Sequence, residues 1–225
     1  MVMIDKAPEV WVIVVAAGSG SRFGAPKQFS ELGGERVVDR AIATATRHAS
    51  GVVVVLPAGF ASDEMPVTVP ADAVVTSVSG AASRSSSVRC GLAAVPATAD
   101  VVLVHDGARP LASDMIYKSV IASVIGGADA VVPAIAVTDT IRRRTGGVVD
   151  RSQLVAVQTP QGFRAQVLRD AHAAGAEATD DAALVEVAGG TVVVVNGDRR
   201  NLKITTPLDL DLAEVLLRHD SGSDD

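Results

Sequence analysis

Residues 10–27 read Val10-Trp11-Val12-Ile13-Val14-Val15-Ala16-Ala17-Gly18-Ser19-Gly20-Ser21-Arg22-Phe23-Gly24-Ala25-Pro26-Lys27. The apolar start predicts a buried β-strand, and the glycine-rich remainder predicts a loop before the next helix. Gly18 and Gly20 allow backbone conformations that other residues avoid, so consecutive N–H groups can turn toward one anion. Arg22 and Lys27 add full positive charges at the same place. The stretch therefore predicts a loop that binds a triphosphate.

Two common phosphate-binding loops do not fit this stretch. The dinucleotide fingerprint needs a glycine where the chain has Phe23, and an acid closing the next strand, where residues 52–57 read Val-Val-Val-Val-Leu-Pro. The Walker pattern needs Gly-Lys-Ser/Thr leading into a helix, but Lys27 follows Pro26. A tight strand-to-helix turn with solvated basic residues is the alternative to phosphate binding, and the cations on both sides of the glycines argue against it.

The composition indicates one domain in a reducing compartment. With 225 residues, 48% of them hydrophobic and 20% charged, the chain can enclose one sizeable core. We expect a single domain over residues 1–219 and a disordered acidic tail at 220–225. Cys90 is the single cysteine, which excludes an internal disulfide and a thiolate metal cluster and predicts a cytoplasmic location.

Charge and hydropathy argue against two classes of partner. The formal net charge of −6 argues against a nucleic-acid polymer, because binding to a phosphate backbone relies on broad basic surfaces. No apolar run approaches membrane-spanning length, and the first residues lack the pattern of a secretory signal. A small anion held by a few local cations stays compatible with this composition.

The hydrophobic pattern predicts an α/β fold with a Rossmann-like, mainly parallel sheet and helices on both faces. Continuous apolar strands agree with burial on two sides. In such sheets the ligand crevice lies beyond the carboxyl ends of the strands, and the polar motifs of this chain follow strand ends. The expected strands are 10–15, 51–56, 74–78, 101–104, 129–135 and 191–195, and the expected helices are 36–49, 84–95, 113–125, 164–175 and 207–218.

Residues 137–151 depart from this alternation. β-branched residues stand on either side of Gly146-Gly147, a pattern that predicts a β-hairpin. Its polar flanks would gain little from lying on the main sheet, so we expect it to project as an arm. A simple exposed hairpin is one interpretation. Because an exposed strand edge usually needs a partner or protection, dimerisation through the arm is the other.

A second polar cluster, Val104-His105-Asp106-Gly107-Ala108-Arg109-Pro110, follows another buried strand. Asp106 is a hard oxygen ligand that can hold magnesium, directly or through water. Arg109 can balance that acid or meet a phosphate. An ion pair between Asp106 and Arg109 that merely closes the loop is the alternative.

Together these motifs make the chain resemble the 2-C-methyl-D-erythritol 4-phosphate cytidylyltransferases over nearly its whole length. The Ala-Ala-Gly-x-Gly-x-Arg loop signals only the broad nucleotidyltransferase class, whereas the His-Asp-Gly-Ala-Arg-Pro and Gln-Thr-Pro-Gln segments are much narrower. The resemblance rests on Ala16-Ala17-Gly18-Ser19-Gly20-Ser21-Arg22, Pro26-Lys27-Gln28, Val104-His105-Asp106-Gly107-Ala108-Arg109-Pro110, Asp139-Thr140, Gln158-Thr159-Pro160-Gln161, Thr179-Asp180-Asp181 and Lys203-Ile204-Thr205.

The resemblance implies transfer of CMP from CTP to the phosphate of methylerythritol phosphate, with release of pyrophosphate. A phosphate monoester is already ionised at neutral pH, so it can attack the α-phosphorus without a base. The protein must then align two polyanions and neutralise the charge that grows on the phosphorus. This agrees with a sequence in which no serine–histidine or paired-carboxylate arrangement stands out.

The resemblance also implies roles for individual residues. Arg22, Lys27 and Lys203 would be catalytic, with the first two holding the triphosphate, and Asp106 would bind magnesium. On the acceptor side the implied contacts are Arg109, Thr140, Arg151, Thr159, Thr179 and Lys203, and on the nucleotide side they are Ala16, Ala17, Gly18, Gly20, Ser87, Asp106 and Gly107.

Three of these assignments carry alternatives. Ser87 would lie near the cytosine, but a helix-capping serine fits equally, and Ala81 stands where the family commonly has a second glycine after Gly80. Arg151 and Lys203 could be solvated surface charges. His105 is expected to be a structural hydrogen-bonding partner behind Asp106 and not a proton-transfer catalyst.

The family's dimer, in which each arm completes the neighbour's site, follows from placing Thr140 and Arg151 on the projecting hairpin. Two other functions stay open. A ribitol 5-phosphate cytidylyltransferase shares the loop and the His-Asp-x-Ala-Arg-Pro pattern. A nucleotide-binding module without chemistry would keep the pocket, although a sensor has little need of cations directed at both substrates.

Overall fold

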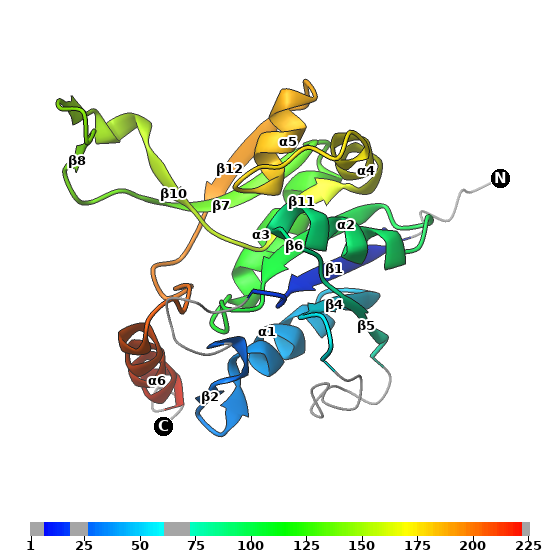
Figure 1. Ribbon diagram of the computed structural model, residues 1–225, viewed down its shortest axis with the longest axis horizontal. Helices are drawn as coiled ribbons and strands as arrows, with labels where there is room; N and C mark the ends of the chain where they lie inside the picture. Colours follow the sequence, from blue (N-terminus) through cyan, green and yellow to red (C-terminus); the bar gives the residue numbers. More distant parts are fainter. Residues whose placement is uncertain (1–6, 19–26, 61–72, 222–225) are drawn as a thin grey trace.

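The valine-rich runs form one eight-stranded sheet with the strand order β10-β7-β11-β6-β1-β4-β5, in which β12 also pairs with β7 (Figure 1). The computed structural model describes residues 7–18, 27–60 and 73–221. The strands of this sheet are β1 (Val10–Val15), β4 (Gly51–Leu56), β5 (Val75–Ser79), β6 (Val101–Asp106), β7 (Ala130–Ala136), β10 (Val155–Val157), β11 (Gln161–Arg164) and β12 (Val192–Asn196).

The sheet is mainly parallel, as predicted. β1 pairs in parallel with β4 and with β6, β4 pairs in parallel with β5, and β7 pairs in parallel with β12. The antiparallel members are β10, which pairs with β7, and β11, which lies between β6 and β7. The carboxyl ends of β1, β4 and β6 therefore meet at one edge of the sheet.

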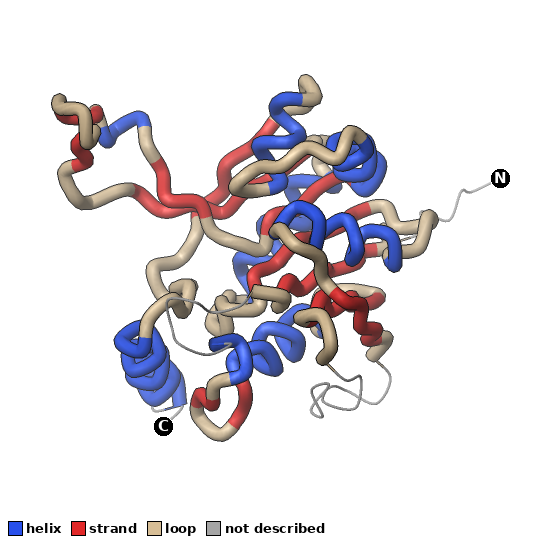
Figure 2. Tube along the Cα trace, viewed as in Figure 1, coloured by secondary structure: helices blue, strands red, loops and turns tan. Residues whose placement is uncertain are grey.

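Helices cover both faces of the sheet (Figure 2). Alternate residues of β1 pack against the two helical layers. Val12 and Val14 belong to the core shared with α1 and α3, whereas Ile13 belongs to the core shared with α2, α4 and α5. This two-sided burial explains why the strands are continuously apolar. The helices are α1 (Val37–Thr46), α2 (Arg84–Ala94), α3 (Asp114–Ile125), α4 (Ala165–Ala173), α5 (Asp181–Val187) and α6 (Pro207–Ser221).

The helix α6 lies apart from these layers, beside the short hairpin of β2 (Glu31–Leu32) and β3 (Glu35–Arg36) (Figure 1). Ala213 of α6 shares a small separate core with Leu32 and Ile204. The helix runs through residues 220 and 221, two residues beyond the expected start of a disordered tail, and residues 222–225 lie outside the described residues. Among the described residues, no helix is both long and apolar enough to cross a bilayer.

The predicted hairpin is confirmed in β8 (Ile141–Arg142) and β9 (Val148–Val149), which pair antiparallel at the end of a long projection (Figure 1). Gly146 and Gly147 take φ angles of 106° and 83°, a region that strongly favours glycine. Residues 137–151 therefore form the arm that the sequence predicts, and a 3-10 turn at Arg151–Gln153 leads from the arm into β10.

Candidate active site

The candidate site is built where β1 and β6 end. Their register pairs Val15 with Asp106, so the residues that follow the two strands lie side by side. The Gly107 N–H donates to the Val15 carbonyl oxygen at 2.9 Å. A Cβ at Gly107 would lie 3.2 Å from the Cβ of Ala16, so glycine permits the close approach of the two loops. The structure thus brings Ala16, Asp106 and Gly107 together.

Gln28 binds the start of the glycine-rich loop. Its side chain is buried, and its Nε2 donates to the carbonyl oxygens of Ala16 at 2.7 Å and of Gly18 at 2.9 Å. Lys27 directly precedes it and begins the short 3-10 helix Lys27–Phe29. Gly20 and Arg22 lie outside the described residues, so their predicted contacts with the triphosphate stay predictions.

Asp106 is the centre of a cluster of cations. Lys203 Nζ lies 2.8 Å and Arg109 Nε lies 3.7 Å from its Oδ2, while Arg84 Nε lies 3.9 Å from its Oδ1. Burial would by itself raise the pKa of Asp106, but Lys203, Arg84 and Arg109 lower that pKa to about 2. Asp106 therefore stays anionic at neutral pH, and the three cations exceed its charge. Such an excess suits an anionic ligand.

His105 is fully buried behind Asp106, and both of its ring nitrogens have partners. Nε2 lies 3.1 Å from the Arg109 carbonyl oxygen, which can only accept, so Nε2 carries the proton. Nδ1 then accepts from the Thr159 hydroxyl at 3.0 Å. Burial lowers the pKa of His105 to about 4, so the ring is neutral at pH 7. The expectation of a structural hydrogen-bonding role for His105 is confirmed.

Thr159 is buried and supports the loop that carries Asp106. Its Oγ1 accepts from the Asp106 N–H at 3.0 Å while its hydroxyl donates to His105. These two bonds occupy the side chain within the protein. The hydrogen bonds of Thr159 show a structural contribution to the site. A contact of Thr159 with the acceptor substrate stays a prediction.

Lys203 reaches Asp106 because the segment before α6 is hydrogen-bonded to the site loops. Arg109 donates to the Asn201 carbonyl oxygen at 2.7 Å, and the Ile204 N–H donates to the Ala108 carbonyl oxygen at 2.9 Å. Asn201 is fully buried and donates to the Thr159 carbonyl oxygen at 2.9 Å. Sequence reasoning missed Asn201 because an isolated asparagine in a loop carries no recognisable pattern.

Ser87 organises the turn at Gly80 and does not cap a helix. Its Oγ accepts from the Ala81 N–H at 3.0 Å, whereas the N-cap of α2 is Ser83, which forms a reciprocal capping box with Ser86. A Cβ at Gly80 would collide with the side chain of Ala17. The Ala81 side chain is exposed, so its methyl group is accommodated next to a tightly packed Gly80.

The remaining acceptor-side candidates lie on the arm and in the loop before α5. Thr140 and Arg151 are on the arm, which projects from the sheet, and the Arg151 guanidinium donates to the Thr138 carbonyl oxygen within the arm (Figure 1). Thr179 is exposed in the loop before α5. One chain therefore places Arg109, Thr159 and Lys203 together but keeps the arm residues apart from them.

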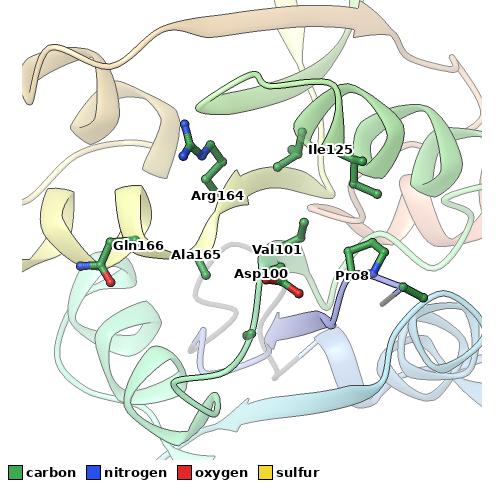
Figure 3. A pocket seen from close by; sticks show the side chains of 10 residues that line it. Pro8, Asp100, Val101, Ile125, Arg164, Ala165 and Gln166 are labelled. Atoms are coloured by element: carbon green, nitrogen blue, oxygen red, sulfur yellow. The ribbon is translucent and has the colours of Figure 1, made fainter. Parts of the chain in front are cut away.

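A cavity of about 580 Å³ lies at the opposite end of β6 (Figure 3). Val101, the first residue of β6, is in its wall, whereas Asp106 is the last residue of that strand. Asp100, Arg164 and Gln166 also line it. This cavity is therefore separate from the candidate site.

The family model for 2-C-methyl-D-erythritol 4-phosphate cytidylyltransferase matches residues 10–219. A protein of that name from Nocardia farcinica is 44% identical over 222 residues, which cover 95% of this chain and 96% of the relative. A bifunctional enzyme IspD/IspF from Clavibacter michiganensis is also 44% identical, over 96% of this chain. This chain spans 56% of the length of that bifunctional relative.

Solved structures agree with the sequence relatives. The cytidylyltransferase of the same description from Thermus thermophilus is 37% identical and superposes with a TM-score of 0.76 over 93% of this chain and 99% of that one. A 4-diphosphocytidyl-2C-methyl-D-erythritol synthase from Anaerococcus prevotii is 27% identical, with a TM-score of 0.79 over 94% of this chain and 99% of that one.

Thr159→Val should lower the free energy of unfolding by about 2–3 kcal/mol, because it leaves the Asp106 N–H and the His105 Nδ1 buried without partners. Thr159→Ser keeps the hydroxyl and should cost only about 1 kcal/mol for the lost methyl group. Denaturant unfolding of both variants measures the difference. Equal losses would show that the hydroxyl is not what supports the loop.

Proposed function

This chain belongs to the 2-C-methyl-D-erythritol 4-phosphate cytidylyltransferase family, and on that basis we propose that it transfers CMP from CTP to 2-C-methyl-D-erythritol 4-phosphate in isoprenoid synthesis. The products are 4-diphosphocytidyl-2-C-methyl-D-erythritol and pyrophosphate. The observation that carries the proposal is the group of Arg84, Arg109 and Lys203 around Asp106, beside the start of the glycine-rich loop.

The chemistry of the described site fits a reaction that needs no protein base. The acceptor phosphate is ionised at neutral pH and can attack the α-phosphorus itself. His105, next to the acid, has both ring nitrogens occupied by protein partners. The site supplies a set of fixed cations. Such preorganised positive charges stabilise the negative charge that develops in the transition state.

Magnesium is part of the proposal, with Asp106 as its protein ligand. The low pKa of Asp106, about 2, keeps a hard anionic oxygen available at neutral pH. Among the described residues, no group of three His, Cys, Asp or Glu side chains is placed to hold a metal. A single carboxylate suits magnesium, which commonly takes its other ligands from substrate phosphates and water. When bound, the ion would neutralise phosphate oxygens of CTP.

The active form proposed is a homodimer in which the arm of one subunit completes the acceptor side of the other. The arm and the strand that follows it expose the apolar side chains of Ile141, Val148, Val155 and Val157, which are 37%, 57%, 49% and 38% exposed. Exposed strand edges with apolar side chains usually have a partner. Thr140 and Arg151 would reach a polyol phosphate from there.

The direct test is an assay with CTP, magnesium and either methylerythritol phosphate or ribitol 5-phosphate. We expect pyrophosphate release with methylerythritol phosphate and little with ribitol 5-phosphate. Turnover confined to ribitol 5-phosphate would favour the other cytidylyltransferase activity. CTP binding without pyrophosphate release from either acceptor would favour a binding module and overturn the proposed activity.

Lys203→Ala should lower kcat by about two to three orders of magnitude, because it removes a cation that lies against Asp106 in the site. Lys118→Ala is the matched control, since Lys118 is an exposed lysine on α3. Steady-state kinetics of both variants, with circular dichroism to verify folding, make the comparison. A kcat near the wild-type value for Lys203→Ala would remove it from the catalytic group.

Sharing of sites between subunits predicts complementation. Lys27→Ala should depress turnover in its own site, and Arg151→Ala should raise the KM for the polyol phosphate more than the KM for CTP. In an isolated heterodimer, one of the two sites receives an intact Lys27 and an intact Arg151, so activity should recover to about half of wild type per dimer.

The measurement is turnover, at a polyol phosphate concentration below the KM of Arg151→Ala, after the two variants are unfolded together, refolded and isolated as heterodimers by two affinity tags. Each variant refolded alone is the control. Heterodimers whose turnover stays no higher than that of the two variants refolded alone would show that each site is built within one chain.

A further inference from the structure

A fully buried acid lies behind the site and is shared by an arginine and a histidine. Asp181 is 0% exposed, and its Oδ2 lies 2.8 Å from an Arg84 guanidinium nitrogen. Its Oδ1 lies 3.1 Å from Nε2 of the buried His172. Asp181 begins α5, Arg84 begins α2 and His172 is in α4, so the three helices on one face of the sheet meet at this carboxylate.

The other side of the Arg84 guanidinium faces the site. Its Nε lies 3.9 Å from Oδ1 of Asp106, whereas Lys203 and Arg109 approach Oδ2 of the same carboxylate. Arg84 therefore bridges an acid within the site and an acid behind it. Burial alone would lower the pKa of Arg84, but Asp181 and Asp106 raise it, so the side chain stays charged.

A buried ion pair of this kind is better suited to fixing an orientation than to stabilising the fold. Taking two charges out of water costs several kcal/mol each, and the attraction between them often does no more than offset that cost. The guanidinium, in contrast, is planar and its N–H donors have a fixed geometry, so two carboxylates can fix its orientation. The Arg84–Asp181 pair restricts the guanidinium on the side away from the site.

We propose that Arg84 is a positioning residue for the nucleotide half of the site, and that Asp181 acts through it. Arg84 orients the Asp106 carboxylate and adds a cation where the triphosphate binds, and Asp181, held by His172, fixes the guanidinium. The inference rests on the proposed cytidylyltransferase function. It differs from a purely structural role, in which the pair would only join α2 to α5.

A matched control exists on the same two segments. Arg89 of α2 donates to Glu177 at 2.8 Å and to the Ala176 carbonyl oxygen at 3.0 Å, so it also joins α2 to the segment before α5. These side chains do not take part in the Asp106 cluster described above. Arg89→Gln thus tests the loss of a connection between the segments while the Arg84 contacts are kept.

The experiment compares Arg84→Gln, Asp181→Asn, their double variant and Arg89→Gln. Calorimetry with CTP and magnesium gives the Kd, and denaturant unfolding gives the stability. We expect Arg84→Gln to raise the Kd about tenfold or more and Asp181→Asn several-fold, as charge-assisted contacts do when lost. Arg84→Gln should also lower stability, because it removes the arginine charge beside the buried Asp181 carboxylate and leaves His172 as its side-chain neighbour.

The double variant separates positioning from structure, because it removes both charges of the pair. We expect it to recover most of the stability lost in Arg84→Gln while its Kd for CTP stays within about twofold of that single variant. Recovery of the wild-type Kd together with stability would show a purely structural pair. If the double variant instead raises the Kd by the product of the two single-variant fold-changes, Asp181 does not act through Arg84.

Failure of the proposal is distinguishable from failure of the proposed function. A wild-type protein that binds CTP and turns over methylerythritol phosphate, together with an unchanged Kd in Arg84→Gln, would overturn the role of Arg84 alone. A comparable rise of the Kd in Arg89→Gln would also overturn it. A wild-type protein that turns over neither acceptor would contradict the proposed function and the inference that rests on it.

Discussion

The pairing of Val15 with Asp106 at the ends of β1 and β6 is the constraint on which the site depends. The glycine-rich loop follows one strand and the acid closes the other, so the register alone brings them together. A slip of one residue would turn the Asp106 side chain to the other face of the sheet, away from its cations. Continuous burial of both strands on two faces opposes such a slip, because the side chains of the two layers fit only one register.

Charge around Asp106 is assembled from parts of the chain that are distant in sequence. Arg84 comes from the start of α2, Arg109 from the loop after β6, and Lys203 from the segment before α6. The three cations repel one another, but each lies on a different element. Backbone hydrogen bonds between those elements, such as that from Ile204 to Ala108, offset the repulsion. The cations are therefore in place without a bound ligand, as preorganised charge requires.

Residues with a strong local pattern were predictable from the sequence, whereas residues placed by tertiary contacts were not. The valine runs gave strands within about a residue of the observed β1, β4 and β12, because burial on both faces leaves an uninterrupted apolar signature. α5 escaped prediction because seven residues are too few to show a helical period, although Asp180 caps its start. Arg84 was overlooked for another reason: its partner Asp181 lies far along the chain, and no local pattern marks an arginine that bridges two acids.

In the proposed dimer, the separation of the arm from the sheet divides the reaction between a half built within one chain and a half that the second copy would supply. Asp106 and Lys203 are held by the ends of strands and by buried amides, so one chain by itself brings these two side chains together. Thr140 and Arg151 stand on a projection whose apolar side chains are exposed, so burying those side chains against a second copy would be favourable. The same contact would bring the acceptor-side residues to a site that one chain leaves open. In this proposed arrangement the free energy of assembly would also position the acceptor, which would tie catalysis to the dimer.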